Sequence, residues 1–345
     1  MNLKKWLRNT VMIGVLTIPL MLTGCGFLSK SSEAIDPPQQ EEQTIEPTAS
    51  WLEQNEDGDH YQVYLQDANG YLAPIALPFV LDEGIAVGKQ LLELMVDNGL
   101  YATMMPGEFR GLIPQGTEVL GFDVTEGIAT VNFSEPFVNY NEADERAIVE
   151  SIVFTLTSLE DIEGVQIQVN GEPLAEMPIA GYPLATILDR HIGINIEMAS
   201  GVNYSQAAPV TLYFSAQTLD AEHYFVPVTR MINREDSTVV AAINELREGP
   251  LDVKSLTPVM MPDVEVTSYE IYDDVLHVDI QDEAYEPGVF VPSQMLNAMI
   301  LSLIDNTNVE AVQLRVNGDI NIFDEHNQSY SEPVSKPEIV NALKL

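Results

Sequence analysis

Cysteine and basic residues are scarce in this chain of 345 residues, and each shortage excludes a class of site or partner. Cys25 is the single cysteine, so there can be no intramolecular disulfide and no cysteine-rich metal site. Fifteen Lys and Arg stand against 53 Asp and Glu, which gives a formal net charge of -38. Nucleic acid and anionic lipid are both bound through clustered Lys and Arg. The sequence therefore predicts no nucleic-acid partner and favours neutral or cationic ones.

The first 24 residues have the pattern of a targeting segment. Three basic residues precede an apolar stretch over 11–22, which is too short to cross a bilayer comfortably. The stretch ends in Leu-Thr-Gly-Cys, with Cys25 last, and this resembles a bacterial lipobox. Such a site is cut before the cysteine, whose thiol is then diacylated, and two acyl chains anchor a protein stably. The alternatives are an ordinary signal peptide with a chance cysteine, or an uncleaved anchor helix.

Residues 25–59 form the next segment, which is rich in Ser, Pro, Gln and Glu and has no apolar period. This composition predicts a flexible acidic tether rather than a folded element. A coil of that length has a root-mean-square reach of about 30 Å. The tether would hold the folded part clear of the membrane surface.

Beyond the tether the chain repeats itself. Residues 165–172 read VQIQVNGE and residues 312–319 read VQLRVNGD, and the segments 117–172 and 264–319 align without a gap. A period this long indicates two tandem domains rather than a solenoid. The expected boundaries are a signal peptide over 1–24, a tether over 25–59, domains over 60–198 and 199–335, and a C-terminal tail over 336–345.

Both copies show one order of elements. Apolar periodicity predicts strands, helices and hairpins in the order β(β)αββαβ. The Asn-Gly pairs at 170–171 and 317–318 predict type I′ turns, and residues 319–323 form a plausible returning strand. The linker over 173–209 holds enough apolar residues to pack partly on the first domain. The expected elements of the first copy are strands near 61–66 and 74–80, a helix over 84–98, strands over 117–124 and 127–133, a helix over 142–159 and a strand over 164–169.

This pattern predicts the α+β class, with two tandem copies of a small mixed-sheet domain and two helices packed on one face of each sheet. Three segments carry a more specific likeness: 116–119 (GTEV), 129–134 (ATVNFS) and 165–171 (VQIQVNG). In this order and spacing they resemble the GerMN domain. With the lipobox and the duplication, the chain resembles the GerM-like family of sporulation and germination lipoproteins with two GerMN domains. The likeness covers about 60–335.

The resemblance implies an assembly role. GerMN domains resemble the ring-building domains of secretion-system proteins. The implied partners are envelope and sporulation-channel proteins, ring-forming ones among them. The implied location is the extracytoplasmic face of the cell membrane, which is the intermembrane space during sporulation. A lipid anchor and a long tether suit that geometry.

Residue types that carry chemistry are present but scattered. No pair of histidines has metal-ligand spacing, and surface or strand-facing positions are the favoured interpretation. Residues 55–59 (NEDGD) lack the full spacing of a calcium loop, so a solvated tether end is favoured. Asp279, Asp282 and Glu283 form an acidic cluster of the kind that chance produces in so acidic a chain. The five histidines are His60, His191, His223, His277 and His326.

Two methionine pairs, at 104–105 and 260–261, precede the matching central strands. Methionine is adaptable at binding surfaces, so these pairs are either docking edges or, as we favour, packing residues. No catalytic residue, metal ligand or cofactor site is predicted, and Cys25 is the one modification site.

We expect a membrane-anchored non-enzymatic scaffold that docks on envelope complexes through its two repeats. The first alternative is a solute-binding envelope lipoprotein with an interdomain ligand cleft, although tandem repeats disfavour small-molecule binding. The second alternative is a cell-wall enzyme that uses the acidic residues.

Overall fold

A computed structural model describes residues 60–343 of the protein. The signal peptide, Cys25 and the tether were all assigned from sequence, and they lie outside these residues. Within the described range no helix is long and apolar enough to span a membrane. All described residues belong to one compact unit.

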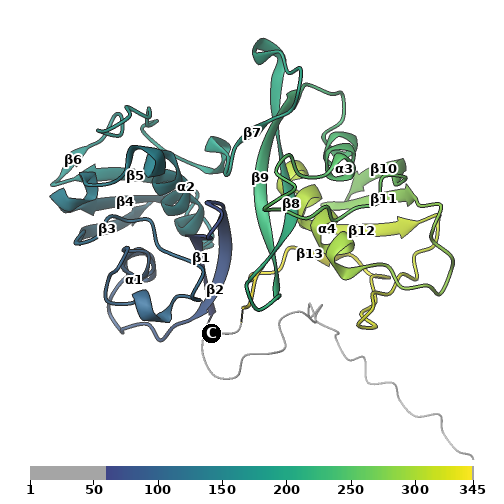
Figure 1. The fold of residues 1–345 in the computed structure, drawn as a ribbon, viewed down its shortest axis with the longest axis horizontal. Helices are drawn as coiled ribbons and strands as arrows, with labels where there is room; N and C mark the ends of the chain where they lie inside the picture. The colour runs from purple at the N-terminus through teal and green to yellow at the C-terminus, as the bar shows by residue number, and fades with distance from the viewer. Residues whose placement is uncertain (1–59, 344–345) are drawn as a thin grey trace, which may run out of the picture. The chain divides into compact units, whose positions relative to one another are not determined.

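The first repeat combines a hairpin, a mixed sheet and two helices (Figure 1). The hairpin strands pair antiparallel, and the sheet has the order β3-β4-β5-β6, with β4 and β5 parallel. Between the parallel strands the chain crosses over through α2, as a parallel pair requires. The elements are β1 (His60–Gln66), β2 (Leu72–Pro78), α1 (Val87–Leu94), β3 (Val119–Thr125), β4 (Ile128–Phe133), α2 (Glu145–Leu156), β5 (Gly164–Val169) and β6 (Glu172–Pro173).

The second repeat has the same order of elements, and the first three strands of its sheet pair as those of the first repeat do. Its sheet runs β10-β11-β12-β13, with β11 and β12 parallel, and its hairpin gains a short parallel strand, β7. This agreement between the repeats confirms the predicted α+β fold. The elements are β7 (Glu197–Met198), β8 (Ala207–Gln217), β9 (His223–Asn233), α3 (Thr238–Glu248), β10 (Glu265–Tyr272), β11 (Val275–Gln281), α4 (Ser293–Thr307), β12 (Ala311–Val316) and β13 (Val334–Ser335).

The longer helix of each repeat forms the centre of its core. α2 contacts β1 on one side and β5 on the other, and α4 contacts β8 and β12 in the same way. The predicted stripe of Ile148, Ile152 and Leu156 is completely buried. Burying one such side chain stabilises the fold by about 1.5–3 kcal/mol. The core is therefore organised around these two helices.

A buried hydroxyl joins helix to hairpin at the same place in both repeats. Thr155 Oγ1 accepts a hydrogen bond from the Tyr64 main-chain N at 2.9 Å, and Ser302 Oγ accepts one from Tyr213 N at 3.0 Å. Both hydroxyl side chains are fully buried. The duplication seen in the sequence thus extends to individual hydrogen bonds, and Tyr64 corresponds to Tyr213.

The tight turns confirm the Asn-Gly prediction. Asn170 has φ 50° and Gly171 has φ 85°, while Asn317 and Gly318 have φ 53° and 81°. Type I′ turns need positive φ at both central positions, which Asn tolerates and Gly adopts freely.

The segment after the second Asn-Gly turn differs from the prediction. Residues 319–323 do not form the expected returning strand; β12 instead pairs with β13. The reason is local, because the Asp319 carboxylate accepts hydrogen bonds from Asn321 N and from the Tyr285 hydroxyl. These bonds hold a turn where a strand was expected.

The linker after β6 packs on the first repeat, as predicted. Leu188 exchanges two main-chain hydrogen bonds with Val165, at 2.8 and 2.9 Å. Met177, Leu188 and Ile194 are buried in the core. The linker therefore completes the sheet of the first repeat.

Candidate functional site

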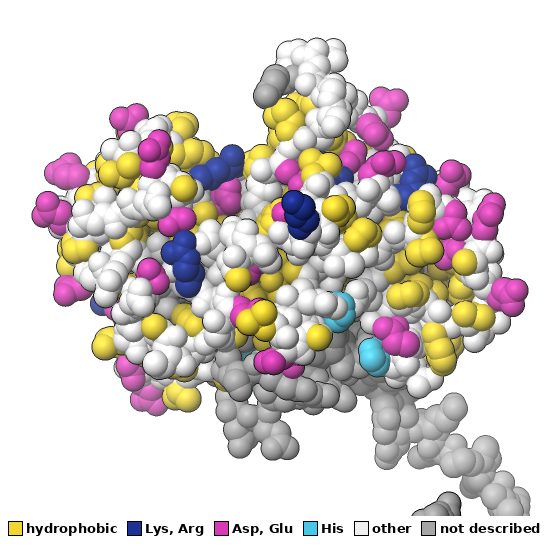
Figure 2. Space-filling model, viewed as in Figure 1, with side chains coloured by type: hydrophobic (Ala, Val, Ile, Leu, Met, Phe, Trp, Pro, Cys, Tyr) yellow, Lys and Arg dark blue, Asp and Glu magenta, His cyan; other side chains and the backbone are white. Residues whose placement is uncertain are grey.

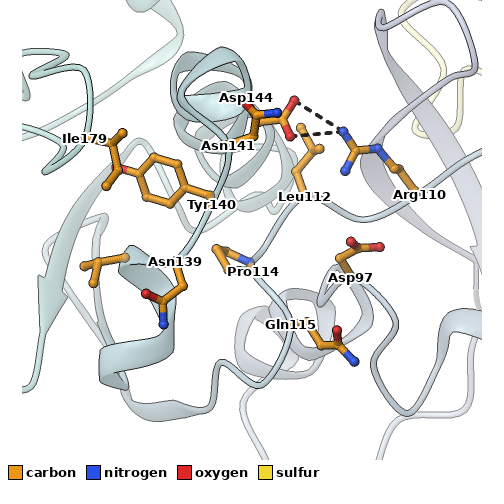
Figure 3. Close-up of a pocket in the computed structure, with 11 residues that line it drawn as sticks. Asp97, Arg110, Leu112, Pro114, Gln115, Asn139, Tyr140, Asn141, Asp144 and Ile179 are labelled. Atoms are coloured by element: carbon orange, nitrogen blue, oxygen red, sulfur yellow. Dashed lines mark hydrogen bonds and ion pairs between the residues drawn. The ribbon is translucent and has the colours of Figure 1, made fainter.

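A polar cleft of about 530 Å³ opens in the first repeat between the segment around Arg110 and the start of α2 (Figure 3). Main-chain hydrogen bonds of 2.9 and 3.0 Å tie Arg110 to Gln66 and fix the base of its side chain. The guanidinium donates to Gln66 Oε1 and to both carboxylate oxygens of Asp144, at 3.3 and 3.2 Å. The cation is thus already neutralised. An exposed pair of this kind contributes about 1 kcal/mol or less.

Tyr140 lies on the far side of the cleft, where its hydroxyl donates to Glu145 at 2.8 Å. Burial, together with this carboxylate, raises the pKa of Tyr140 well above its ordinary value. The phenol therefore stays protonated at neutral pH. Among the described residues that line the cleft there is no Ser, Cys, His or Lys. The arrangement suits binding of a polar group better than acid–base or nucleophilic chemistry.

Behind the cleft, Glu145 acts as a structural anchor. Its buried carboxylate accepts hydrogen bonds from Ile179 N (3.0 Å), Ala180 N (2.7 Å) and Tyr182 N (2.7 Å). Burial alone would raise the pKa of Glu145, but these bonds and the Tyr140 hydroxyl outweigh it and hold the pKa below its ordinary value. A negative charge is stable here because four donors surround it. Glu145 holds the linker against α2.

The histidines are not brought together. His223 hydrogen-bonds with Ser215 and Gln217, and His191 pairs with Asp189 at the surface. The His277 ring stacks on Tyr272, with centroids 4.0 Å apart. In residues 60–343, no group of three or more His, Cys, Asp or Glu side chains is placed to hold a metal ion.

The acidic cluster after β11 holds turns. Asp279 Oδ1 accepts a hydrogen bond from Gly318 N at 3.1 Å, and Asp282 Oδ1 accepts one from Ala284 N at 2.8 Å. Asn132 Oδ1 accepts from Gly171 N in the first repeat, at the position equivalent to Asp279. The two copies therefore use this position to fix the same Asn-Gly turn.

The methionine pairs behave differently from one another. Met104 and Met105 are half-buried and pack against the core, and Met260 is buried. Met261 is 57% exposed. Packing is thus the role of three of the four, as the sequence favoured.

The surface that sequence reasoning missed is the outer edge of β10. β10 is the first strand in its sheet, so within the described residues its outer side has no strand partner. Tyr269, Ile271 and Tyr272 are 43%, 52% and 51% exposed. By cross-strand pairing, Tyr269 and Ile271 lie on the helix side of the sheet and Tyr272 on the other side. The strand therefore presents apolar groups on both faces next to unpaired main-chain groups.

Acidic residues surround this edge. Glu265, Glu270, Asp273 and Asp274 are all exposed. Figure 2 shows acidic side chains spread over this face of the molecule, with few Lys or Arg among them. An unpaired apolar edge is a template for an added strand. The acidic border is electrostatically complementary to a cationic surface.

The edge strand of the first repeat, β3, is a weaker version of this surface. Leu120 and Val124 are 50% and 40% exposed, and it carries no aromatic side chain as exposed as those of β10. The one sequence signal that could have indicated the β10 surface is the run of apolar residues at consecutive and alternate positions over 269–272. Such a pattern does not reveal which strand lies at an edge.

Comparisons with known proteins agree with the duplicated fold. A family model described as "Sporulation and spore germination" (Germane) matches residues 62–175 and 211–321. The chain is 34% identical to "Spore germination protein GerM" of Bacillus subtilis (strain 168), over 94% of this chain and 95% of that protein.

Solved structures of the same relative are similar too. The tandem GerMN domains of the sporulation protein GerM from Bacillus subtilis match with a TM-score of 0.77 and 36% identity, over 83% of this chain and 99% of that chain. The first GerMN domain of the same protein covers 39% of this chain and 98% of that chain, at 36% identity and a TM-score of 0.37.

Proposed function

Because this chain belongs to the Germane family of sporulation and spore germination proteins, we propose that it is a membrane-anchored, non-enzymatic scaffold that docks on envelope protein complexes. Its similarity to GerM over nearly the whole of both chains implies a role in sporulation or spore germination. In that role the protein would act through an exposed sheet edge, at the outer face of the cell membrane.

The β10 edge is the observation that carries the docking proposal. Three large apolar side chains lie beside main-chain donors and acceptors that no strand of the described chain uses. A partner segment could add as a further strand of the ladder, with apolar side chains against Tyr269 and Ile271. Its cationic side chains would face Glu265 and Glu270. Main-chain pairing gives affinity in such complexes, and side-chain contacts give specificity.

Lipidation at Cys25 would supply the anchor. Diacylation would hold the protein at the outer face of the cytoplasmic membrane, in the intermembrane space during sporulation. The acidic tether over 25–59 would let the β10 edge reach complexes away from the lipid surface.

The experiment replaces Tyr269 and Ile271 together by Lys in the chromosomal gene. Both side chains are more than 40% exposed, so the fold should lose less than about 1 kcal/mol. We expect the number of heat-resistant spores to fall at least about tenfold. The two introduced lysines would repel a cationic partner and so disrupt docking. Immunoblotting checks that the protein level is unchanged.

Val253→Lys is the matched control, since Val253 is 71% exposed but lies outside β10. It should sporulate as wild type does. Wild-type spore numbers in the double variant, with normal protein levels, would show that the β10 edge is not the docking surface.

A second candidate function, binding of a solute between the repeats, is favoured by one observation. A pocket of about 460 Å³ is lined by residues of both repeats, including Met104, Met105, Asp220 and Leu343. Its apolar and acidic lining suits a cationic organic solute. A screen of such solutes by thermal shift tests this function, and a stabilisation that Met105→Lys abolishes would support it.

A further inference from the structure

Two sets of hydrogen bonds at the junction of the repeats, one made by Asn195 and one by Asn341, match each other. The equivalent residues are fixed by the hairpins, since Tyr64 pairs with Pro74 in the first and Tyr213 pairs with Pro227 in the second. Pro74 therefore corresponds to Pro227. By the same register, Leu72 corresponds to Phe225, because each lies two residues earlier in its strand.

The segments that end each repeat correspond as well. Leu188 pairs with Val165 after the first sheet, and Val334 pairs with Val312 after the second. Asn195 follows Leu188 by the same number of residues as Asn341 follows Val334. These two asparagines are thus equivalent positions of the repeat.

Asn195 joins the two hairpins. Its Oδ1 accepts a hydrogen bond from Leu72 N at 2.9 Å, and its Nδ2 donates to Leu72 O at 2.7 Å. The same Nδ2 donates to Pro227 O of the second repeat at 2.7 Å. One side-chain amide therefore bonds to both main-chain groups of Leu72 in its own repeat and to the carbonyl of Pro227 in the other repeat.

Asn341 makes the equivalent set of hydrogen bonds in the opposite direction. Its Oδ1 accepts from Phe225 N at 2.8 Å, and its Nδ2 donates to Phe225 O at 2.8 Å. The Nδ2 also donates to Pro74 O of the first repeat at 2.8 Å. Each partner is the equivalent of an Asn195 partner, with the two repeats exchanged.

Main-chain bonds also cross in both directions, although their acceptors differ by one position in the repeat. Ala76 N donates to Asn341 O at 2.8 Å, and its counterpart Thr229 donates through N to Ile194 O at 2.8 Å. Thus the terminal segment of each repeat crosses to the hairpin of the other. Val340 and Leu343 are buried at the end of this crossing.

We propose that the two repeats form an isologous pair, as two copies of one domain do in a two-fold symmetric dimer, and that the junction surface of each repeat is self-complementary. In a two-fold interface, residue i contacts residue j of the partner and j contacts i. The Asn195 and Asn341 bonds fulfil this rule atom by atom. A chance contact between domains on a flexible linker gives no such correspondence.

The partner that fits this surface is therefore a second copy of the same domain. β2 and β9 are occupied in the junction, whereas β3 and β10 remain as outer edges at equivalent positions of the pair. The junction and the β10 edge use different strands, so the pairing of the repeats can be tested independently of docking.

A protease site in the exposed turn at 200–201 of the mature chain provides the test. After cleavage we expect the two halves to stay associated at micromolar concentration. Asn195→Ala and Asn341→Ala should each raise the dissociation constant by about 10- to 100-fold. Each substitution leaves buried main-chain N–H and C=O groups without a hydrogen-bond partner. Equal effects, within a factor of about three, are expected from equivalent positions.

Asn139→Ala is the control, since Asn139 is exposed and lies away from the junction. If a variant does not survive cleavage, hydrogen exchange in the uncleaved chain gives the answer. Asn195→Ala should speed exchange at Leu72 and Asn341→Ala at Phe225. Halves that separate at micromolar concentration while folded, or an effect of only one asparagine, would overturn the isologous pair.

Self-complementarity of the junction surface can be tested separately, by asking whether each half pairs with a second copy of itself. The cleaved halves are unfolded together, refolded and analysed by native mass spectrometry. We expect homodimers of each half beside the mixed pair. A mixture that contains the mixed pair alone would overturn self-complementarity.

Discussion

Single carboxylates hold this fold in place, and Glu145 shows how. The helix expected over 142–159 begins with several acidic residues, and the helix dipole favours negative charge at that end. In the structure Glu145 also fixes the linker, because three main-chain N–H groups of the linker donate hydrogen bonds to its carboxylate. Sequence alone could not reveal this, since the donors lie more than thirty residues further on.

Glu145→Gln should therefore lower the free energy of unfolding at neutral pH by about 2–3 kcal/mol, because an amide cannot accept all four hydrogen bonds. Chemical denaturation measures this loss. Glu142→Gln is the control, since Glu142 is exposed in the preceding turn and should lose less than about 0.5 kcal/mol.

The pH dependence of this difference has a defined sign. The pKa of Glu145 is lower in the folded protein than its ordinary value, so the stabilisation is complete above the unfolded pKa. It is lost as the pH falls through the folded pKa. The stabilities of wild type and Glu145→Gln should thus begin to converge as the pH falls below about 4.5, and they should become similar once the pH is below the folded pKa. A difference that persists unchanged to pH 3 would contradict the ionised role.

At the scale of elements, a buried arginine connects three of them. Arg230 on β9 is 1% exposed and donates to Glu197 of β7 at 2.6 Å and to Glu245 of α3 at 2.9 Å. It also donates to Gly249 O at the end of α3, at 2.8 Å. One cation thus forms ion pairs with two carboxylates that belong to different elements.

Arg230→Met should destabilise the protein by about 3–5 kcal/mol, because two partly buried carboxylates are left facing each other. Burial already raises the pKa of Glu197, and loss of the cation would raise it further. The folded variant would then bind protons more readily than the unfolded chain, so its stability should rise as the pH falls from 8 to 5. Thermal unfolding at both pH values measures the effect.

Arg247→Met on the same helix is the matched control. Its pair with Glu265 spans 3.8 Å, and Glu265 is 72% exposed, so its loss should cost about 1 kcal/mol or less. An equal effect of the two variants would show that burial of the ion pair is unimportant.

Elements were predictable where the pattern is local. The stripe of Ile148, Ile152 and Leu156 marks α2, and Asn170-Gly171 marks a hairpin turn, because neighbours in sequence decide both. The returning strand after Gly318 was not predictable, since an Asp319 carboxylate turn replaces it. The edge position of β10 depends on which strands pair, and pairing is a non-local property.

At the scale of the molecule, duplication and charge were visible in the sequence, and the junction between the repeats was not. The offset of the repeat indicated two domains of one fold, which the structure confirms. No sequence pattern marks Asn195 and Asn341, because their partners lie up to 267 residues away in the chain. Only the folded hairpins bring Pro74, Phe225 and Pro227 within reach of two amides.

Membrane anchoring is a property of the whole molecule. Cys25→Ala removes the thiol that would be acylated, so the protein should move from the membrane fraction to the soluble fraction of sporulating cells. A freely diffusing scaffold loses the high local concentration that a tether provides, and the effective concentration of a tethered site is of order millimolar. Heat-resistant spores should therefore fall by at least about tenfold even though residues 60–343 fold normally, which circular dichroism of the purified variant checks. Cys25→Ala protein that stays in the membrane fraction would show that the apolar stretch over 11–22 is itself the anchor, and the lipid would then have no part in the mechanism.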